Sequence, residues 1–299
     1  MNICVIGPGR IGSVVAMRLS LVGKNKVTVV ARGSRLQQLE RDQAIVHKDG
    51  RSAPVTVHSV FDASVEYDLV VVAVLWHQVE ALLPALRASK AAKIMTFFSM
   101  FGSAQALREA IGADKFEMGF PGILSNVDAE TGLVSGDASP SGPTTMLSNA
   151  SLVEVFQASG MRCSHEANME LWLNNQYAFA FPLLWVLFQS HLRGAGLPWA
   201  ECKAAARAIH QGQDLVRKQR GSVYPFGKKL IRATPARVIA AVFWCVTRIS
   251  AVRRGAAMMG DAEALRTSET AVMSRTLLAA AEQADMPCGN IAKLKLTVV

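Results

Sequence analysis

The sequence predicts an α/β protein in two parts, an open parallel sheet with crossover helices followed by an all-helical region. In the first half, short continuous apolar runs alternate with amphipathic stretches; in the second half, long stretches with helical periodicity end at Gly and Pro. The 299 residues, 51% hydrophobic and 18% charged, have the composition of a globular protein of one large or two ordinary domains. This composition excludes disordered and fibrous proteins.

The predicted sheet depends on four Val- and Ile-rich runs bounded by turn residues, as expected of parallel strands buried on both faces. The runs are Ile3–Ile6, Val27–Ala31, Leu69–Val74 and Ile94–Phe98, and the helical stretches between them are Ile11–Leu21, Ser34–Arg41 and Gln78–Arg87. Repeated strand–helix units with right-handed crossovers form a doubly wound sheet. Between Gly119 and Gly142, short runs punctuated by turn residues predict hairpins or irregular edge structure.

The second half predicts a bundle of helices. Its helical stretches are Asn168–Arg193, Trp199–Arg220, Pro235–Met259 and Ala262–Ala284. We therefore expect a first domain over residues 1–166 and an all-α second domain over residues 167–299.

A glycine-rich motif, Gly7-Pro8-Gly9-Arg10-Ile11-Gly12, follows the first predicted strand and opens the first predicted helix. In this context the first glycine permits a tight turn, the second lets the backbone approach a pyrophosphate, and the third lets the helix pack on the strand. The helix N-terminus offers unpaired N–H groups to the same pyrophosphate. The motif predicts a Rossmann-type dinucleotide-binding domain with cofactor contacts at Gly7, Gly9, Arg10, Ile11 and Gly12; the alternative is a glycine turn without a ligand.

The end of the second predicted strand carries Arg32, 20 residues after Gly12. An NAD-preferring site usually places Asp or Glu there to bind the ribose 2′-OH. A guanidinium instead suits a 2′-phosphate, so NADP(H) is the predicted cofactor, with Arg32 favoured over Arg35 as the phosphate ligand. The alternative is that both arginines belong to a solvated helix start.

Several segments resemble the ketopantoate reductase family. They are VIGPGRIGS at the start, VVARGSRLQQL at the second strand, ELW at Glu170–Trp172 and LRTSET at 265–270. The resemblance implies a Rossmann-type domain, a helical domain, and reduction of a 2-oxo acid by NADPH in the cleft between them. It also implies that the end of the predicted strand Leu69–Val74 and the segment after it, with Val74 and Gln78, contact the cofactor.

The sequence departs from the family where the family's chemistry takes place. The family's catalytic lysine falls at Asn174, or at Leu173 in a second alignment frame, and a conserved asparagine falls at Ser99. The family's substrate-binding glutamate is kept as Glu269. Because a lysine that protonates the developing alkoxide contributes about 10²–10⁴-fold to the rate, we expect a substrate other than ketopantoate.

Four residues are candidates for a rebuilt catalytic site: His77, Ser99, Asn174 and Glu269. His77 follows the predicted strand Leu69–Val74 at the sheet edge where such folds bind ligands, and imidazole exchanges protons near neutral pH. The alternative is that His77 is an ordinary polar residue at a helix start. Glu269 facing an imine would favour the protonated form that accepts hydride. These features predict an NADP(H)-dependent oxidoreductase acting on a small carbonyl or imine substrate; the alternative is a catalytically silent NADP(H)-binding sensor or scaffold.

The net charge of +9 comes from one segment, because residues 215–260 contain ten basic residues and no acidic one. We favour an apolar helix buried in the second domain with its charges solvated, over a surface for nucleic acid or an anionic membrane. The five cysteines lack metal-ligand or disulfide spacing, and no apolar run is long enough to span a bilayer. We therefore expect a cytoplasmic protein without a metal, without nucleic-acid binding or stable membrane insertion, and, from the family resemblance, a homodimer.

Overall fold

The computed structural model describes residues 1–138, 142–257 and 269–295. Its internal contacts divide the chain into two compact units, Met1–Ser99 with Ser103–Glu170, and Met100–Gly102 with Leu171–Val299. The main division thus follows Glu170, four residues after the predicted boundary. The short segment Met100–Gly102, which the sequence analysis had placed in the first domain, groups with the second unit.

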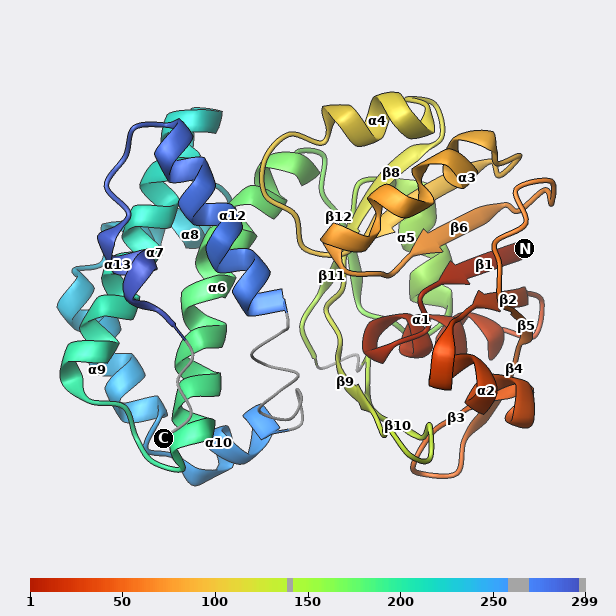
Figure 1. Cartoon of the computed structure of the whole chain (residues 1–299), viewed down its shortest axis with the longest axis horizontal. Helices are drawn as coiled ribbons and strands as arrows, with labels where there is room; N and C mark the ends of the chain where they lie inside the picture. Colours follow the sequence, from red (N-terminus) through yellow and green to blue (C-terminus); the bar gives the residue numbers. More distant parts are fainter. Residues whose placement is uncertain (139–141, 258–268, 296–299) are drawn as a thin grey trace. The chain divides into compact units, whose positions relative to one another are not determined.

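The first unit is built on an eight-stranded sheet in the order β12-β11-β8-β7-β6-β1-β2-β5 (Figure 1). From β5 to β8 all neighbours are parallel, and β11 runs antiparallel to β8. The parallel part has the Rossmann order, with β1 and β6 adjacent where the strand order reverses. The strands are β1 (Asn2–Ile6), β2 (Lys26–Val30), β5 (Thr56–His58), β6 (Leu69–Val72), β7 (Lys93–Phe97), β8 (Phe116–Phe120), β11 (Thr145–Leu147) and β12 (Cys163–His165).

Helices flank this sheet because its central strands are apolar on both faces. One core joins Ile3 and Val5 of β1 to Val14 and Met17 of α1 and to Phe156 of α5. The helical elements are α1 (Arg10–Ser20), α2 (Gly33–Asp42), the 3₁₀ turns η1 (Trp76–Gln78) and η2 (Glu80–Leu82), α3 (Leu83–Ala88), α4 (Gln105–Ile111) and α5 (Ala150–Ala158). The predicted α/β class is therefore confirmed.

The stretch Gln78–Arg87, expected as one helix, instead forms η1, η2 and the short α3. The Gln78 side chain accepts a hydrogen bond from the backbone N–H of Leu75 at 3.2 Å, which caps a tight first turn. Pro84 lies in the first turn of α3, where its missing N–H costs no intrahelical hydrogen bond. The prediction of a single helix was wrong because two local turn signals outweighed the apolar spacing.

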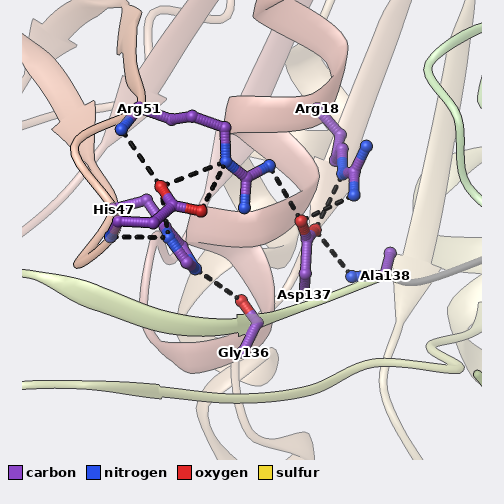
Figure 2. A network of polar contacts seen from close by, with 7 residues as sticks. Arg18, His47, Arg51, Gly136, Asp137 and Ala138 are labelled. Atoms are coloured by element: carbon purple, nitrogen blue, oxygen red, sulfur yellow. Dashed lines mark hydrogen bonds and ion pairs between the residues drawn. The ribbon is translucent and has the colours of Figure 1, made fainter.

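Two antiparallel hairpins complete the first unit: β3 (Ala44–Val46) with β4 (Ser52–Pro54), and β9 (Leu124–Val127) with β10 (Val134–Asp137). Figure 2 shows the polar network that joins them to α1. Arg18 donates to both carboxylate oxygens of Asp137 at 2.7 and 2.6 Å, and Arg51 donates to the same carboxylate at 2.9 Å. Burial raises the pKa of Asp137, but these arginines outweigh it and hold the pKa below its usual value.

The second unit is helical, as predicted. Its helices are α6 (Met169–Arg193), α7 (Trp199–Arg220), α8 (Phe226–Ala233), α9 (Ala236–Val246), α10 (Ser250–Ala257), α12 (Glu269–Gln283) and α13 (Gly289–Lys293). Its core packs Phe181 and Trp185 of α6 against Ala205 and Ile209 of α7, with Leu277 of α12. Among the described residues, no helix combines the length and apolar character needed to cross a membrane.

The sequence expectation for Pro235–Met259 requires two corrections. The stretch contains two helices, α9 and α10, separated at residues 247–249, and residues 258–259 lie outside the described part of the chain. In addition, α9 is not a buried apolar helix, because only Ala240 and Phe243 of its residues are buried. Most of its remaining side chains are exposed to solvent, a feature considered further below.

Candidate functional site

The glycine-rich turn between β1 and α1 has the geometry that dinucleotide binding requires. Gly7 has a φ of +86°, and a Cβ there would lie 2.7 Å from Cγ1 of Val74. A Cβ at Gly12 would lie 2.2 Å from the carbonyl oxygen of Gly7. At Gly9, by contrast, a Cβ would meet no protein atom within 4 Å. Two glycines thus pack the turn, and the third opens the backbone to a ligand.

Helix α1 presents its N-terminus at this opening. Gly9 is the N-cap residue and brings no capping side chain, and the first turn has no acidic residue. The N–H groups at the first positions, Arg10 and Ile11, have no acceptor within the helix and carry the positive end of its dipole. The carbonyl of Pro8 turns the other way and accepts a hydrogen bond from the Ser13 hydroxyl at 2.6 Å. The turn therefore offers donors, and no anionic group, to a phosphate.

Arg32 and Arg35, at the start of α2, have different environments. The Arg35 guanidinium is largely buried and donates to the Pro8 carbonyl at 2.9 Å, the Ser13 hydroxyl at 3.0 Å and the Gly132 carbonyl at 2.8 Å. Burial lowers its pKa to about 10. Arg32 is exposed at the N-cap of α2, and none of the described residues forms a hydrogen bond or ion pair with its guanidinium. Of these two arginines, Arg32 is the one whose guanidinium is free to bind a phosphate.

The ends of β6 and β7 carry the next set of predicted residues. Val74 packs against the glycine turn, as its distance to Gly7 shows, and His77 is exposed within η1. Ser99 follows β7 and is partly exposed. The adjacent rings of Trp76 and Phe98 lie 5.8 Å apart in a tilted arrangement. The sheet order brings these residues to the carboxyl edge where β6 and β7 end, next to the glycine turn.

Asn174 lies in the second unit and is fully buried on α6. Its side-chain oxygen accepts from the Gly102 N–H at 2.8 Å, and its nitrogen donates to the Gly102 carbonyl at 3.0 Å. The amide therefore pairs with one backbone residue as a neighbouring strand would. Nearby, Phe101 packs against Tyr177 at a ring distance of 5.7 Å, which explains why Met100–Gly102 belongs to this unit.

Glu269 opens α12, but its side chain lies outside the described part of the structure, as does Ser268 before it. Within the described ranges no group of three His, Cys, Asp or Glu side chains is placed to hold a metal ion. All five cysteines are free thiols.

Comparison with known proteins bears on this arrangement of glycine turn and sheet edge. Residues 3–128 match the family model "Ketopantoate reductase PanE/ApbA". The resemblance stated from the sequence motifs is confirmed over this segment. No curated protein matches the sequence significantly.

Solved structures of ketopantoate reductases and a related dehydrogenase share the fold over almost the whole chain. D-mandelate dehydrogenase with NADH and anilino(oxo)acetate has a TM-score of 0.75 at 14% identity, covering 98% of this chain and 96% of that one. 2-Dehydropantoate 2-reductase from Porphyromonas gingivalis W83 has a TM-score of 0.70 at 13% identity, covering 98% of this chain and 97% of that one. The dimeric ketopantoate reductase from Staphylococcus aureus has a TM-score of 0.68 at 12% identity, covering 98% of this chain and 96% of that one. The chain therefore has a ketopantoate-reductase-like fold.

Sequence reasoning did not foresee two features of the site. The first is the role of Arg35, which fixes the glycine turn to the β9–β10 hairpin through Pro8 and Gly132. Residues three positions apart lie on one face of a helix, so the spacing of Arg32 and Arg35 carried no signal that their roles differ. The second is the pairing of Asn174 with Gly102, which joins residues 72 positions apart and has no local signal.

Proposed function

We propose that this chain is an NADP(H)-dependent oxidoreductase that transfers hydride to or from a small carbonyl or imine substrate. The observation that carries the proposal is the glycine turn, in which Gly7 and Gly12 are packed while the position of a Gly9 Cβ is open. A nicotinamide dinucleotide would fit this turn with its pyrophosphate at the N–H groups of Arg10 and Ile11. The related dehydrogenase with bound NADH supports the same class of cofactor.

The residues of the glycine turn, the sheet edge and the helical unit would have different roles in this reaction. When bound, the nicotinamide ring supplies or accepts the hydride. The N–H groups of α1 neutralise pyrophosphate charge, the exposed Arg32 guanidinium binds the 2′-phosphate, and Val74 and Gln78 lie beside the cofactor. His77 and Ser99, at the sheet edge, are the proposed polar groups near the reacting carbon, and Glu269 is the proposed substrate carboxylate. We propose Asn174 as a positioning residue that holds the segment Met100–Gly102, which follows Ser99 in the chain, through its pairing with Gly102.

The cofactor proposal is tested by substituting Gly9 with alanine. Gly9 has a φ of −78°, and an added Cβ meets no atom of the protein, so Gly9→Ala should keep the melting temperature of the wild type. The methyl group would occupy the pyrophosphate position, so NADPH affinity should fall at least about tenfold by calorimetry. Gly227→Ala, another open glycine, is the matched control and should bind NADPH normally. Unchanged affinity in Gly9→Ala would contradict the proposal.

The preference for NADP(H) is tested at Arg32. Loss of a charge-assisted hydrogen bond costs about 1.5–3 kcal/mol, so Arg32→Gln should weaken NADPH binding roughly ten- to hundredfold. Binding of NADH should not change, because NADH lacks the 2′-phosphate. Tighter binding of NADH than of NADPH by the wild type would overturn the role of Arg32.

A second candidate function is a catalytically silent NADP(H)-binding protein. It is favoured by the expected loss of the family's lysine, which falls at Asn174 or Leu173, and by the Asn174 side chain, whose two amide atoms are hydrogen-bonded to Gly102. The two functions separate on turnover. Consumption of NADPH with a panel of 2-oxo acids, imines and hydrophobic ketones, lowered by Glu269→Ala, supports the enzyme. Tight NADPH binding with no turnover of any of them supports the silent protein.

A further inference from the structure

Helix α9 is apolar on two opposite sides, and only one of them is covered. Ala240, Phe243 and the following Thr247 form the buried side. Val238 is 48% exposed and Val242 is 54% exposed. Ala241 and Cys245, at spacings of three and seven residues from Val238, continue this exposed stripe. Because a solvated helix face is normally polar, the stripe indicates a surface that contacts something other than water.

Exposed apolar side chains continue on both sides of α9 in the sequence. Phe226 and Leu230, one turn apart on α8, are 78% and 61% exposed, and Ile249 after α9 is 50% exposed. Trp244 on α9 is 39% exposed. We call these residues the α8–α9 surface: Phe226, Leu230, Val238, Val242, Trp244 and Ile249. More than half of the large apolar side chains that the described residues expose belong to it.

The charged side chains that α8 and α9 themselves carry are all basic; one of them, Arg232 of α8, is paired with Asp214 of α7 at 2.9 Å. No acidic residue occurs between positions 215 and 260. Lys229 and Arg237 are exposed, and no carboxylate of the described residues pairs with them. The Arg248 guanidinium stacks on Trp244, 3.6 Å from the ring centroid. Each of the two helices therefore exposes large apolar side chains next to an exposed cation, Lys229 on α8 and Arg237 on α9.

We propose that the α8–α9 surface binds the anionic headgroup surface of a lipid bilayer, with its apolar side chains at the boundary between headgroups and acyl chains. An amphipathic helix with Trp, Phe and Leu on one side and cations beside them binds membranes in this way without crossing them. A second copy of the chain fits less well, because a symmetric contact would oppose cations to cations. Nucleic acid would pair the cations and leave the apolar side chains without a partner.

Vesicle flotation tests this inference with the full-length protein. Wild type should float with vesicles of phosphatidylcholine and phosphatidylglycerol, and not with phosphatidylcholine alone. High salt should release it, because each cation near an anionic surface contributes about a fivefold effect on partitioning. Trp244 gives a second readout: brominated lipid should quench tryptophan emission, and Trp244→Phe should lose that quenching.

Two double variants separate the contributions of the apolar and the cationic side chains to vesicle partitioning. Val238→Ser with Val242→Ser should lower partitioning at least about tenfold by removing apolar contact. Lys229→Gln with Arg237→Gln should lower partitioning by roughly twenty-fivefold, about fivefold for each cation. The matched controls change exposed residues of the first unit. Val60→Ser is the control for the apolar variant, and Lys90→Gln with Arg87→Gln is the control for the charge variant; both should float as the wild type does.

Three outcomes would overturn the proposal. The first is no flotation with either vesicle, or equal flotation with both. The second is a dimer, by light scattering, that Val238→Ser with Val242→Ser dissociates, because the surface would then bind a second copy. The third is salt-dependent binding of duplex DNA that the charge variant loses and the apolar variant keeps. None of these outcomes depends on NADPH binding, so the proposed oxidoreductase function is tested separately.

Discussion

Arg32 and Arg35 have the same chemical group and different tasks in the structure. The Arg35 guanidinium donates to Pro8, Ser13 and Gly132, whereas the Arg32 guanidinium has no partner among the described residues. Arg35→Ala should therefore lower the free energy of unfolding by about 2–3 kcal/mol, because the buried carbonyls would lose their donors. The same substitution should also weaken the binding of NADPH and of NADH to the same extent, because it loosens the glycine turn.

Chemical denaturation and calorimetry on Arg35→Ala and Arg32→Ala check this difference. Arg32→Ala should unfold at the same denaturant concentration as the wild type. It should weaken the binding of NADPH and leave the binding of NADH unchanged. A loss of stability in Arg32→Ala, or a selective loss of NADPH in Arg35→Ala, would show that the two roles are exchanged.

Asn174 gives a second prediction at the scale of single residues. Both of its amide atoms bond to Gly102, so Asn174→Ala should cost about 2 kcal/mol of stability by leaving two backbone groups unpaired. Asn174→Lys, which introduces the residue type that the sequence resemblance places here in one of two alignment frames, should be at least as destabilising because it buries an ammonium group. Exposed Asn168→Ala is the control and should melt with the wild type. Equal melting of all variants would contradict a structural role for the pairing.

At the scale of elements, α8 places an amine against α6. The Lys228 ammonium nitrogen lies 3.3 Å from the ring centroid of Phe179, and burial lowers the pKa of Lys228 to about 7. The ring face favours the cation, but desolvation is larger. Since the unfolded chain binds this proton more tightly than the folded one, stability should rise as the pH increases from about 7 to about 10.

Unfolding measured at pH 7 and at pH 10 tests this arrangement. Lys228→Met should be more stable than the wild type at pH 7, and the difference should shrink by pH 10. Lys229→Met, at the exposed neighbouring position, should show no such pH-dependent difference. A constant difference between Lys228→Met and wild type at both pH values would show that the amine is not desolvated.

The elements also show where sequence reasoning succeeds. Strands β1, β2, β6 and β7 and helices α6 and α7 lie where the apolar periodicity predicts them, since each is buried by local pattern alone. The sequence analysis also identified Gly7, Gly9 and Gly12, because their roles depend on a motif and its context.

Sequence reasoning fails where distant residues decide the structure. The exposure of α9 depends on which neighbours pack on it, and its composition reads as buried on every side. The segment Met100–Gly102 belongs to the second unit because of Asn174 and Tyr177, more than 70 positions away. The segment from 78 to 87 required capping and proline signals to be weighed against apolar spacing.

At the scale of the whole molecule, the five free thiols can report unfolding of each unit. Burial raises the pKa of Cys4 and of Cys163 in the first unit to about 12, and that of Cys202 in the second unit to about 11. Cys245 is exposed on α9. In native protein at mildly alkaline pH, an alkylating reagent should modify Cys245 rapidly and the three buried thiols only when their unit opens.

Mass spectrometry of the labelled peptides checks this expectation and also locates the cofactor. NADPH should slow labelling of Cys4 and Cys163, because a ligand stabilises the unit that binds it. Rapid native labelling of Cys4, which lies in the central strand β1, would be incompatible with the sheet described above.

Because Met100–Gly102 belongs to the second unit while Ser99 and Ser103 belong to the first, the chain passes between the units three times. A fragment that starts at residue 171 therefore lacks Phe101 and Gly102, the partners of Tyr177 and Asn174. A fragment that stops at residue 170 keeps Phe101 with nothing from the second unit to bury it. Neither half can therefore be separated at a single peptide bond without losing the contacts of Phe101 and Gly102 with α6.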